Sequence, residues 1–204
     1  RRIMGVDPSG EGLNETMWVV RDQYTAKIVA KEKISNEKSI AQKTLTLMSY
    51  YAIQLQDVVI DNFGVGANVS QQLILASYGS EDYHGEAPTA VNVGEPSDEE
   101  DFQNKRAELY YALKQWLRSG GELVYDDRWK QLLNIRYRRE LNGKMKIMGK
   151  LEMQKEGIAS PDAADALMLT FWFGEKLVGQ EVTIYKPNWK PRVAEKPTIF
   201  KPRW

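Results

Sequence analysis

Three strand-like segments separated only by short turns open the chain, and this arrangement strongly limits the folds available to it. Apolar and β-branched side chains dominate residues 3–7, 16–20 and 26–30. The first segment ends in a run of turn residues, and the second and third are joined by residues 22–24. Short turns between successive strands favour antiparallel pairing. The amino-terminal part therefore predicts an antiparallel meander.

Helices and strands alternate after the meander. A helical pattern over residues 39–56 precedes a buried-type strand over residues 57–61 and a helix that opens at Gly64 and Gly66. Two short strands are expected over residues 90–93 and 123–125, and three helices over residues 101–119, 127–133 and 160–173. A hairpin is expected over residues 136–139 and 144–147. In the last helix Ser160 is the predicted cap and Pro161 the first helical residue. This order predicts an α/β fold with a mixed sheet, in one domain over residues 1–179.

The last segment, residues 180–204, loses this periodicity. It contains six bases, two acids, two tryptophans and four Lys-Pro pairs. Such a composition predicts an extended or disordered basic tail. Since the chain begins with Arg1 rather than methionine, we also expect it to be a processed product or an excised domain.

The composition excludes several kinds of chemistry. The chain has no cysteine and one histidine, His84, which excludes disulfides and thiol catalysis and argues against a catalytic triad or a histidine-rich metal site. No run approaches the roughly 20 apolar residues that cross a bilayer, so we expect no membrane association. Catalysis would therefore depend on carboxylates, hydroxyls, lysines or a hard cation.

Four aspartates stand at positions where functional sites occur. Asp7 ends the first strand and Asp61 ends another, and ligands bind beyond strand ends in α/β sheets. Asp162 and Asp165 lie three residues apart in the first turns of the last helix, so they share one helix face near its positive end.

Convergence of these carboxylates would make them repel one another unless a cation neutralised them. Oxygen ligands without histidine favour Mg²⁺ or Mn²⁺, and a pair of such ions can promote phosphodiester hydrolysis. Each aspartate also has a structural alternative: a turn residue at Asp7, a cap at Asp61 and a first-turn acid at Asp162. Taken together, the four predict a two-metal site.

Basic residues gather near the carboxyl-terminal half. Nine bases and two acids lie between Arg128 and Lys155, although the whole chain has 28 of each sign. Asn142-Gly143 predicts a hairpin turn within this stretch. A concentrated positive surface suits a polyanion, and a solvated face balanced by acids elsewhere is an equal alternative. The candidate phosphate-binding side chains are Arg136, Arg138, Arg139, Lys144, Lys146 and Lys150.

Several motifs, in this order, carry a resemblance to a known family. They are Met4-Gly5-Val6-Asp7-Pro8-Ser9-Gly10-Glu11-Gly12, Val59-Ile60-Asp61, Asn104-Lys105-Arg106-Ala107-Glu108 and Ser160-Pro161-Asp162-Ala163-Ala164-Asp165-Ala166-Leu167. Over most of the chain the sequence resembles the nuclease domain of the large terminase subunit of tailed bacteriophages. The resemblance implies a ribonuclease-H-like fold, with a mixed five-stranded sheet and helices on both faces.

The resemblance also implies roles for the aspartates. Asp7 would bridge two metal ions, Asp61 and Asp165 would complete the catalytic acids, and Asp162 would be an accessory ligand or a substitute for Asp165. Family members often carry Glu-Ser-Lys before the penultimate helix. Here Met148-Gly149-Lys150 keeps only the lysine.

The implied function is an endodeoxyribonuclease that cuts concatemeric viral DNA during packaging. Its partners would be double-stranded DNA, the small terminase subunit and the portal, in the cytoplasm of the infected bacterium. The packaging ATPase of such subunits is expected to be absent, because no Gly-x₄-Gly-Lys-Ser/Thr string occurs. The alternatives are a Holliday-junction resolvase or transposase-like nuclease of the same fold, and a non-catalytic nucleic-acid-binding module.

Overall fold

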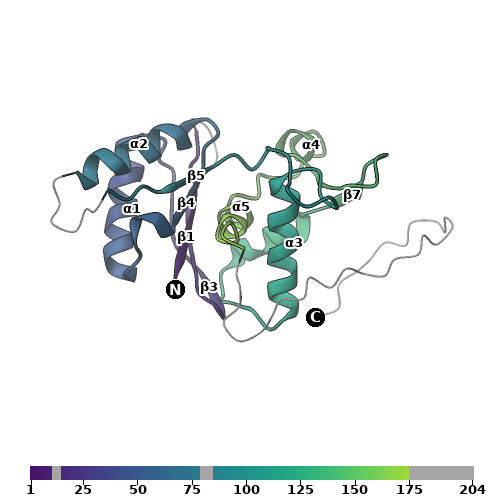
Figure 1. The fold of residues 1–204 in the computed structure, drawn as a ribbon, viewed down its shortest axis with the longest axis horizontal. Helices are drawn as coiled ribbons and strands as arrows, with labels where there is room; N and C mark the ends of the chain where they lie inside the picture. The colour runs from purple at the N-terminus through teal and green to yellow at the C-terminus, as the bar shows by residue number, and fades with distance from the viewer. Residues whose placement is uncertain (11–14, 79–84, 175–204) are drawn as a thin grey trace.

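The computed structural model describes residues 1–10, 15–78 and 85–174 (Figure 1). The predicted tail and the last residues of the predicted domain lie outside these ranges. The main element is a six-stranded sheet in the order β5-β4-β1-β2-β3-β6. Its strands are β1 (Ile3–Asp7), β2 (Thr16–Arg21), β3 (Thr25–Glu32), β4 (Val58–Asp61), β5 (Thr89–Val91) and β6 (Glu122–Leu123).

The sheet is mixed, as the sequence predicts. Strands β1, β2 and β3 pair antiparallel, which confirms the meander. Strand β4 pairs parallel with β1, and β5 pairs parallel with β4. The expectation of five strands is wrong for this chain, because β6 adds a sixth by pairing parallel with β3.

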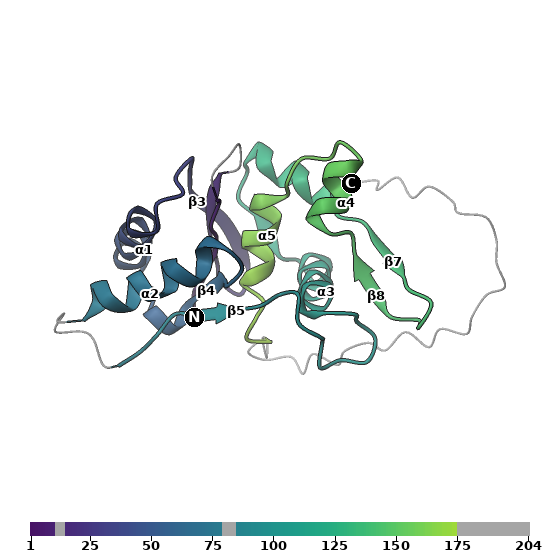
Figure 2. The same cartoon turned by 90° about the horizontal axis from the view of Figure 1, so that it is seen from above.

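Helices cover both faces of the sheet (Figures 1 and 2). Helices α1 (Glu37–Tyr51) and α2 (Val65–Ser77) pack on one face, over a core that includes Met4 and Val6. Helices α3 (Lys105–Arg118) and α5 (Asp162–Leu169) lie on the side of the other core, which includes Ile3. Alternate residues of β1 thus point into different cores, as strand geometry requires.

Several helix ends differ from the predicted ones. Asn36 and Asn104 cap α1 and α3 by accepting hydrogen bonds from the amides of Ser39 and Ala107, so α1 starts earlier than predicted and α3 later. Pro161, not Ser160, is the N-cap of α5, because the Ser160 hydroxyl contacts the Asp162 carboxylate instead. Helix α5 also ends before the predicted residue 173.

The remaining elements surround the carboxyl-terminal half of the molecule. The predicted hairpin is confirmed as β7 (Tyr137–Arg139) and β8 (Met145–Ile147). The predicted helix from Asp127 is the 3-10 segment η2 (Asp127–Asn134), with Asp126 as its cap. Helix α4 (Lys150–Lys155) lies where the resemblance implies the penultimate helix. The end of the helix predicted over residues 39–56 forms a separate 3-10 turn, η1 (Leu55–Asp57).

Candidate active site

Strands β1 and β4 bring Asp7 and Asp61 to the same edge of the sheet. The parallel register pairs Val6 with Ile60, and each aspartate is the next residue of its strand. Val6 and Ile60 both point into the core under α1 and α2, so the two aspartates, one residue later, point toward α5. The predicted convergence of these two strand ends is therefore present in the structure.

Helix α5 lies directly on β1 because the strand carries a glycine at the contact. A Cβ atom on Gly5 would lie 1.9 Å from the Ala166 backbone oxygen, so any side chain there would push the helix away. The close contact places the first turns of α5, with Asp162 and Asp165, beside the end of β1. Both carboxylates are buried, as is Asp7.

Asp165 has polar partners on two helices, α3 and α4 (Lys150–Lys155). The Tyr110 hydroxyl donates a hydrogen bond of 2.6 Å to Oδ1, and the Arg106 guanidinium forms an ion pair of 2.8 Å with the same oxygen. Oδ2 is buried and accepts no hydrogen bond from the described residues, but lies 3.2 Å from the Lys150 ammonium. One oxygen of Asp165 is thus fixed by α3, and the other faces the remaining carboxylates.

Lys150 is the first residue of α4 and joins two of the acids. Its ammonium lies 3.3 Å from Asp7 Oδ2 as well as 3.2 Å from Asp165 Oδ2. The sequence grouped Lys150 with the phosphate-binding side chains of the hairpin. The structure places it among the carboxylates instead, where its charge offsets their repulsion.

Arg106 and Tyr110 were not predicted from the sequence as site residues. Both lie on the buried face of α3, four residues apart and therefore on one side of the helix. Arg106 could have been recognised from the sequence, because it lies on the apolar face of an amphipathic helix and a buried guanidinium requires a carboxylate partner.

The surroundings shift the pKa values of the acids in different directions. Burial raises the pKa of Asp7 to about 7, assisted by the charges of Asp165, Asp162 and Asp61 and opposed by Lys150. Burial also raises the pKa of Asp61. Burial acts in the same direction on Asp165, but Arg106 and Lys150 outweigh it and hold its pKa below the usual value. Asp165 is thus the stable anion of the group, whereas Asp7 titrates near neutrality.

We call Asp7, Asp61, Asp162 and Asp165 the carboxylate cluster. Its donor set is oxygen only, which suits a hard divalent cation. Within the described ranges, no three acidic or histidine side chains already stand close enough together to hold an ion. The four carboxyl groups have two bases beside them among the described residues, Arg106 and Lys150, and the pKa of Asp7 is raised, first by burial and then by the charges of the other three acids. A divalent cation would supply the missing charge, and the residues present fit one.

The predicted basic residues of the hairpin are exposed or partly exposed. Three of them contact glutamates: Arg136 pairs with Glu156, Arg138 with Glu140 and Glu152, and Lys146 with Glu140. Arg139 donates a hydrogen bond to the Gly143 carbonyl across the hairpin turn. We refer to β7, β8 and the side chains of Arg136, Arg138, Arg139, Lys144 and Lys146 as the basic hairpin.

A mixed sheet covered by helices on both faces, with aspartates at the ends of β1 and β4 and on α5, defines a ribonuclease-H-like fold with an acidic site. Searches found no matching family model and no matching curated protein. Solved structures do match. The nuclease domain of the large terminase subunit of bacterial virus Sf6 aligns with 25% identity and a TM-score of 0.70, over 83% of this chain and 86% of that one.

A second match is the large terminase nuclease of the thermophilic phage G20c, with 18% identity and a TM-score of 0.57, over 84% of this chain and 81% of that one. A mutant of the Sf6 domain has been solved with manganese, and the G20c nuclease with bound magnesium. The family resemblance and the fold class inferred from the sequence are confirmed. The chain is similar to the nuclease domains of large terminase subunits.

Proposed function

We propose that this chain is a divalent-metal-dependent DNA endonuclease, acting as the nuclease domain of a large terminase subunit. The observation that carries the proposal is the carboxylate cluster, four aspartates brought to the end of β1 by a parallel strand and by a helix packed on Gly5. The similarity to terminase nuclease domains supports the same function. A non-catalytic binding module would have no use for buried acids that repel one another.

The cluster would hold two Mg²⁺ or Mn²⁺ ions. Asp7, Asp61 and Asp165 are the proposed catalytic acids, with Asp162 as a further ligand. Manganese in an Sf6 domain structure and magnesium in the G20c nuclease support this choice of ion. Bound there, such ions would supply activation of a water molecule and stabilisation of the leaving oxygen of a phosphodiester.

The residues around the cluster prepare it for this role. Arg106 and Tyr110 fix Oδ1 of Asp165 and so orient its Oδ2 toward the other acids. Lys150 lies close to both Asp7 and Asp165, near the position that the substrate phosphate would approach. Its ammonium offsets the repulsion of the free protein and would stabilise phosphate charge when DNA is present.

The basic hairpin is the proposed contact with the DNA backbone. Residues 136–156 carry seven basic and three acidic side chains, a net charge of +4. Their ion pairs with Glu140, Glu152 and Glu156 are exposed, and exposed pairs contribute little stability. Phosphates can therefore replace these glutamates at low cost, in contacts that position DNA without reading its sequence.

In the cell the domain would cut concatemeric viral DNA during packaging, in the cytoplasm of an infected bacterium. The small terminase subunit and the portal would be its partners through the full-length subunit, and the packaging ATPase would be a separate domain of that subunit. Double-stranded DNA is the substrate expected from the similarity to the terminase nucleases.

Incubation of supercoiled plasmid with the protein and Mn²⁺ tests the proposal. We expect nicked and linear products that disappear when EDTA removes the metal, and no preference for a four-way junction over plain duplex. Intact plasmid at every Mn²⁺ and Mg²⁺ concentration would overturn the nuclease assignment. Exclusive cleavage of the junction would instead identify a resolvase.

A further inference from the structure

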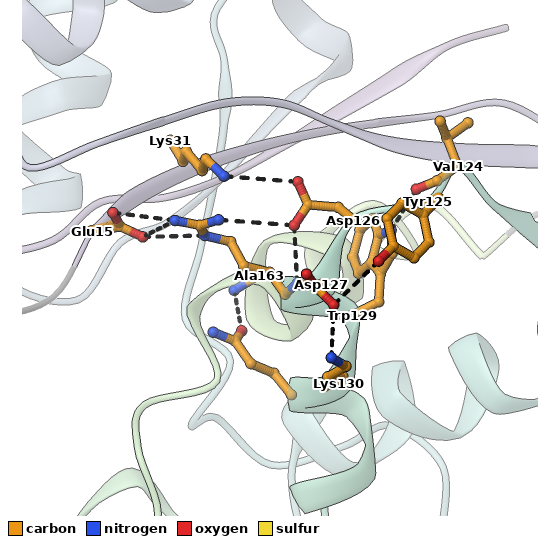
Figure 3. A network of polar contacts seen from close by, with 11 residues as sticks. Glu15, Lys31, Val124, Tyr125, Asp126, Asp127, Trp129, Lys130 and Ala163 are labelled. Atoms are coloured by element: carbon orange, nitrogen blue, oxygen red, sulfur yellow. Dashed lines mark hydrogen bonds and ion pairs between the residues drawn. The ribbon is translucent and has the colours of Figure 1, made fainter.

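The 3-10 segment η2 lies against the start of α5 and is fixed there by its own tryptophan (Figure 3). The Trp129 side chain is buried in the core shared with α3 and α5, and its indole nitrogen donates a hydrogen bond of 2.8 Å to the Val124 carbonyl. From this anchored segment Gln131 contacts the first turn of α5, and Arg128 contacts Glu15, just before β2. Neither residue belongs to the carboxylate cluster or to the basic hairpin.

Gln131 satisfies a backbone amide at the first turn of α5. Its side-chain oxygen accepts a hydrogen bond of 2.8 Å from the Ala163 amide, the residue directly after Asp162. Amides in the first turn of a helix have no partner within the helix, and a buried one is costly when left unpaired. Gln131 therefore fixes the backbone that carries Asp162.

Arg128 acts on the same aspartate through Glu15. Its guanidinium donates hydrogen bonds of 3.2 Å and 3.1 Å to Glu15 Oε2, and Asp126 lies 3.9 Å from it (Figure 3). The Glu15 amide in turn donates a longer hydrogen bond of 3.4 Å to Asp162 Oδ2. The ion pair thus holds the start of β2 over the carboxylate of Asp162.

We propose that Arg128 and Gln131 are positioning residues for Asp162, so that η2 sets the affinity of the cluster for its cation. The inference rests on the proposed function, because it assigns these side chains to the support of a metal ligand. The Arg128–Glu15 pair is about 30% exposed on each side, and such pairs add little to folding. Its main effect is therefore expected on the site rather than on the fold.

Mn²⁺ titration of the free protein by calorimetry tests this inference without DNA. Arg128→Gln removes the ion pair, and we expect its dissociation constant for Mn²⁺ to rise about tenfold, as for other residues that orient metal ligands. Gln131→Met should act in the same direction. Lys130→Gln is the matched control, because Lys130 lies in the same segment but pairs with the exposed Asp127. It should leave the affinity unchanged.

The pattern of kinetic changes separates positioning from a loss of structure. For Arg128→Gln the Mn²⁺ concentration that gives half-maximal plasmid cleavage should rise about tenfold, with the rate at saturating Mn²⁺ within about twofold. The thermal midpoint in EDTA should match that of Lys130→Gln. Arg128→Lys, which keeps the charge but not the two-pronged geometry, should restore part of the affinity.

A double-mutant cycle decides whether Arg128 acts through Asp162. In an Asp162→Asn background, Arg128→Gln should cause no further loss of Mn²⁺ affinity. If Arg128→Gln lowered the Mn²⁺ affinity as much in the Asp162→Asn background as in wild type, the inference would be overturned. It would also be overturned if Arg128→Gln and Lys130→Gln had the same affinity for Mn²⁺. In either case, cleavage by the wild-type protein would still uphold the proposed function. A wild-type protein that neither bound Mn²⁺ nor cut DNA would overturn both.

Discussion

The charges of the carboxylate cluster are buried, whereas those of the basic hairpin are exposed. Asp7, Asp162 and Asp165 are at most 9% exposed, and the cluster is packed against bases from α3 and α4. Arg136 and Arg138 of the hairpin are exposed and pair with neighbouring glutamates at the surface. A buried charge cannot exchange its partner for water, whereas an exposed one can. Single changes should therefore be severe in the cluster and mild in the hairpin.

The largest effect is expected from Asp7→Asn. The substitution keeps size but removes the charge that the proposed cations require, and metal ions contribute several kcal/mol to such reactions. We expect plasmid nicking at saturating Mn²⁺ to fall at least about 1,000-fold. Initial rates read from gels test this, with circular dichroism as the control for folding. Near-normal nicking would remove Asp7 from the site.

The two aspartates of α5 should differ from each other. Asp165 is fixed by Tyr110 and Arg106, so its replacement also leaves a buried guanidinium without its partner. We expect Asp165→Ala to abolish cleavage and Asp162→Ala to weaken it about tenfold, mainly through metal affinity. Cleavage rates over a range of Mn²⁺ concentrations separate the cases. An active Asp165→Ala beside an inactive Asp162→Ala would exchange the two roles.

The pKa of Asp7 predicts a pH dependence of stability in EDTA. Its folded-state pKa is raised to about 7 from 3.8, so between these values the folded protein keeps a proton that the unfolded chain has lost. Stability from this group therefore falls as pH rises through that window. At pH 8 we expect Asp7→Asn to be about 4 kcal/mol more stable than wild type, with little difference near pH 4.

Asp165→Asn is the control of opposite sign. The pKa of Asp165 is lowered, so its contribution to stability is present above its unfolded value and lost as pH falls. Denaturant unfolding at pH 4 and pH 8 measures both variants. Equal stability of Asp7→Asn and wild type at pH 8 would contradict the raised pKa.

The smallest effect per residue is expected in the hairpin. Alanine at Arg138, Arg139, Lys144 and Lys146 together should lower cleavage about tenfold near 0.1 M salt, and each lost phosphate contact should flatten the salt dependence of DNA binding by about one unit. The free energy of unfolding should change by less than about 1 kcal/mol. Four exposed bases elsewhere provide the matched control: Lys27, Lys38, Arg118 and Lys130. Equal losses in both quadruple variants would remove the hairpin from the DNA path.

The two regions also differ in how far the sequence predicted them. The hairpin followed from a local signal, Asn142-Gly143 between strand-like segments, and its pairing is confirmed. The positions of Asp7 and Asp61 at neighbouring strand ends followed from the apolar runs before them. Patterns of this kind involve residues close together in the chain, so they can be recognised in the sequence.

The partners of the cluster were beyond reach of the sequence. Lys150 contacts Asp7 across 143 residues, and Tyr110 contacts Asp165 across 55. Helix α4, which carries Lys150, has only six residues, too few for a periodic signal. Strand β6 falls on the predicted strand over residues 123–125, but its position beside β3 depends on packing and was not predicted. Contacts between segments far apart in the chain produce no local sequence pattern, so they could not be predicted.

The most direct test of the metal centre is the thermal midpoint measured against Mn²⁺ concentration, for wild type and Asp7→Asn at pH 8. A ligand that binds only the folded state stabilises it by about 2.7 kcal/mol at 100 times its dissociation constant, and for a chain of this size that raises the midpoint by roughly 5–10 °C. We predict this rise for wild type and none for Asp7→Asn. An equal rise in both proteins, or no rise in either, would contradict a metal centre built on Asp7.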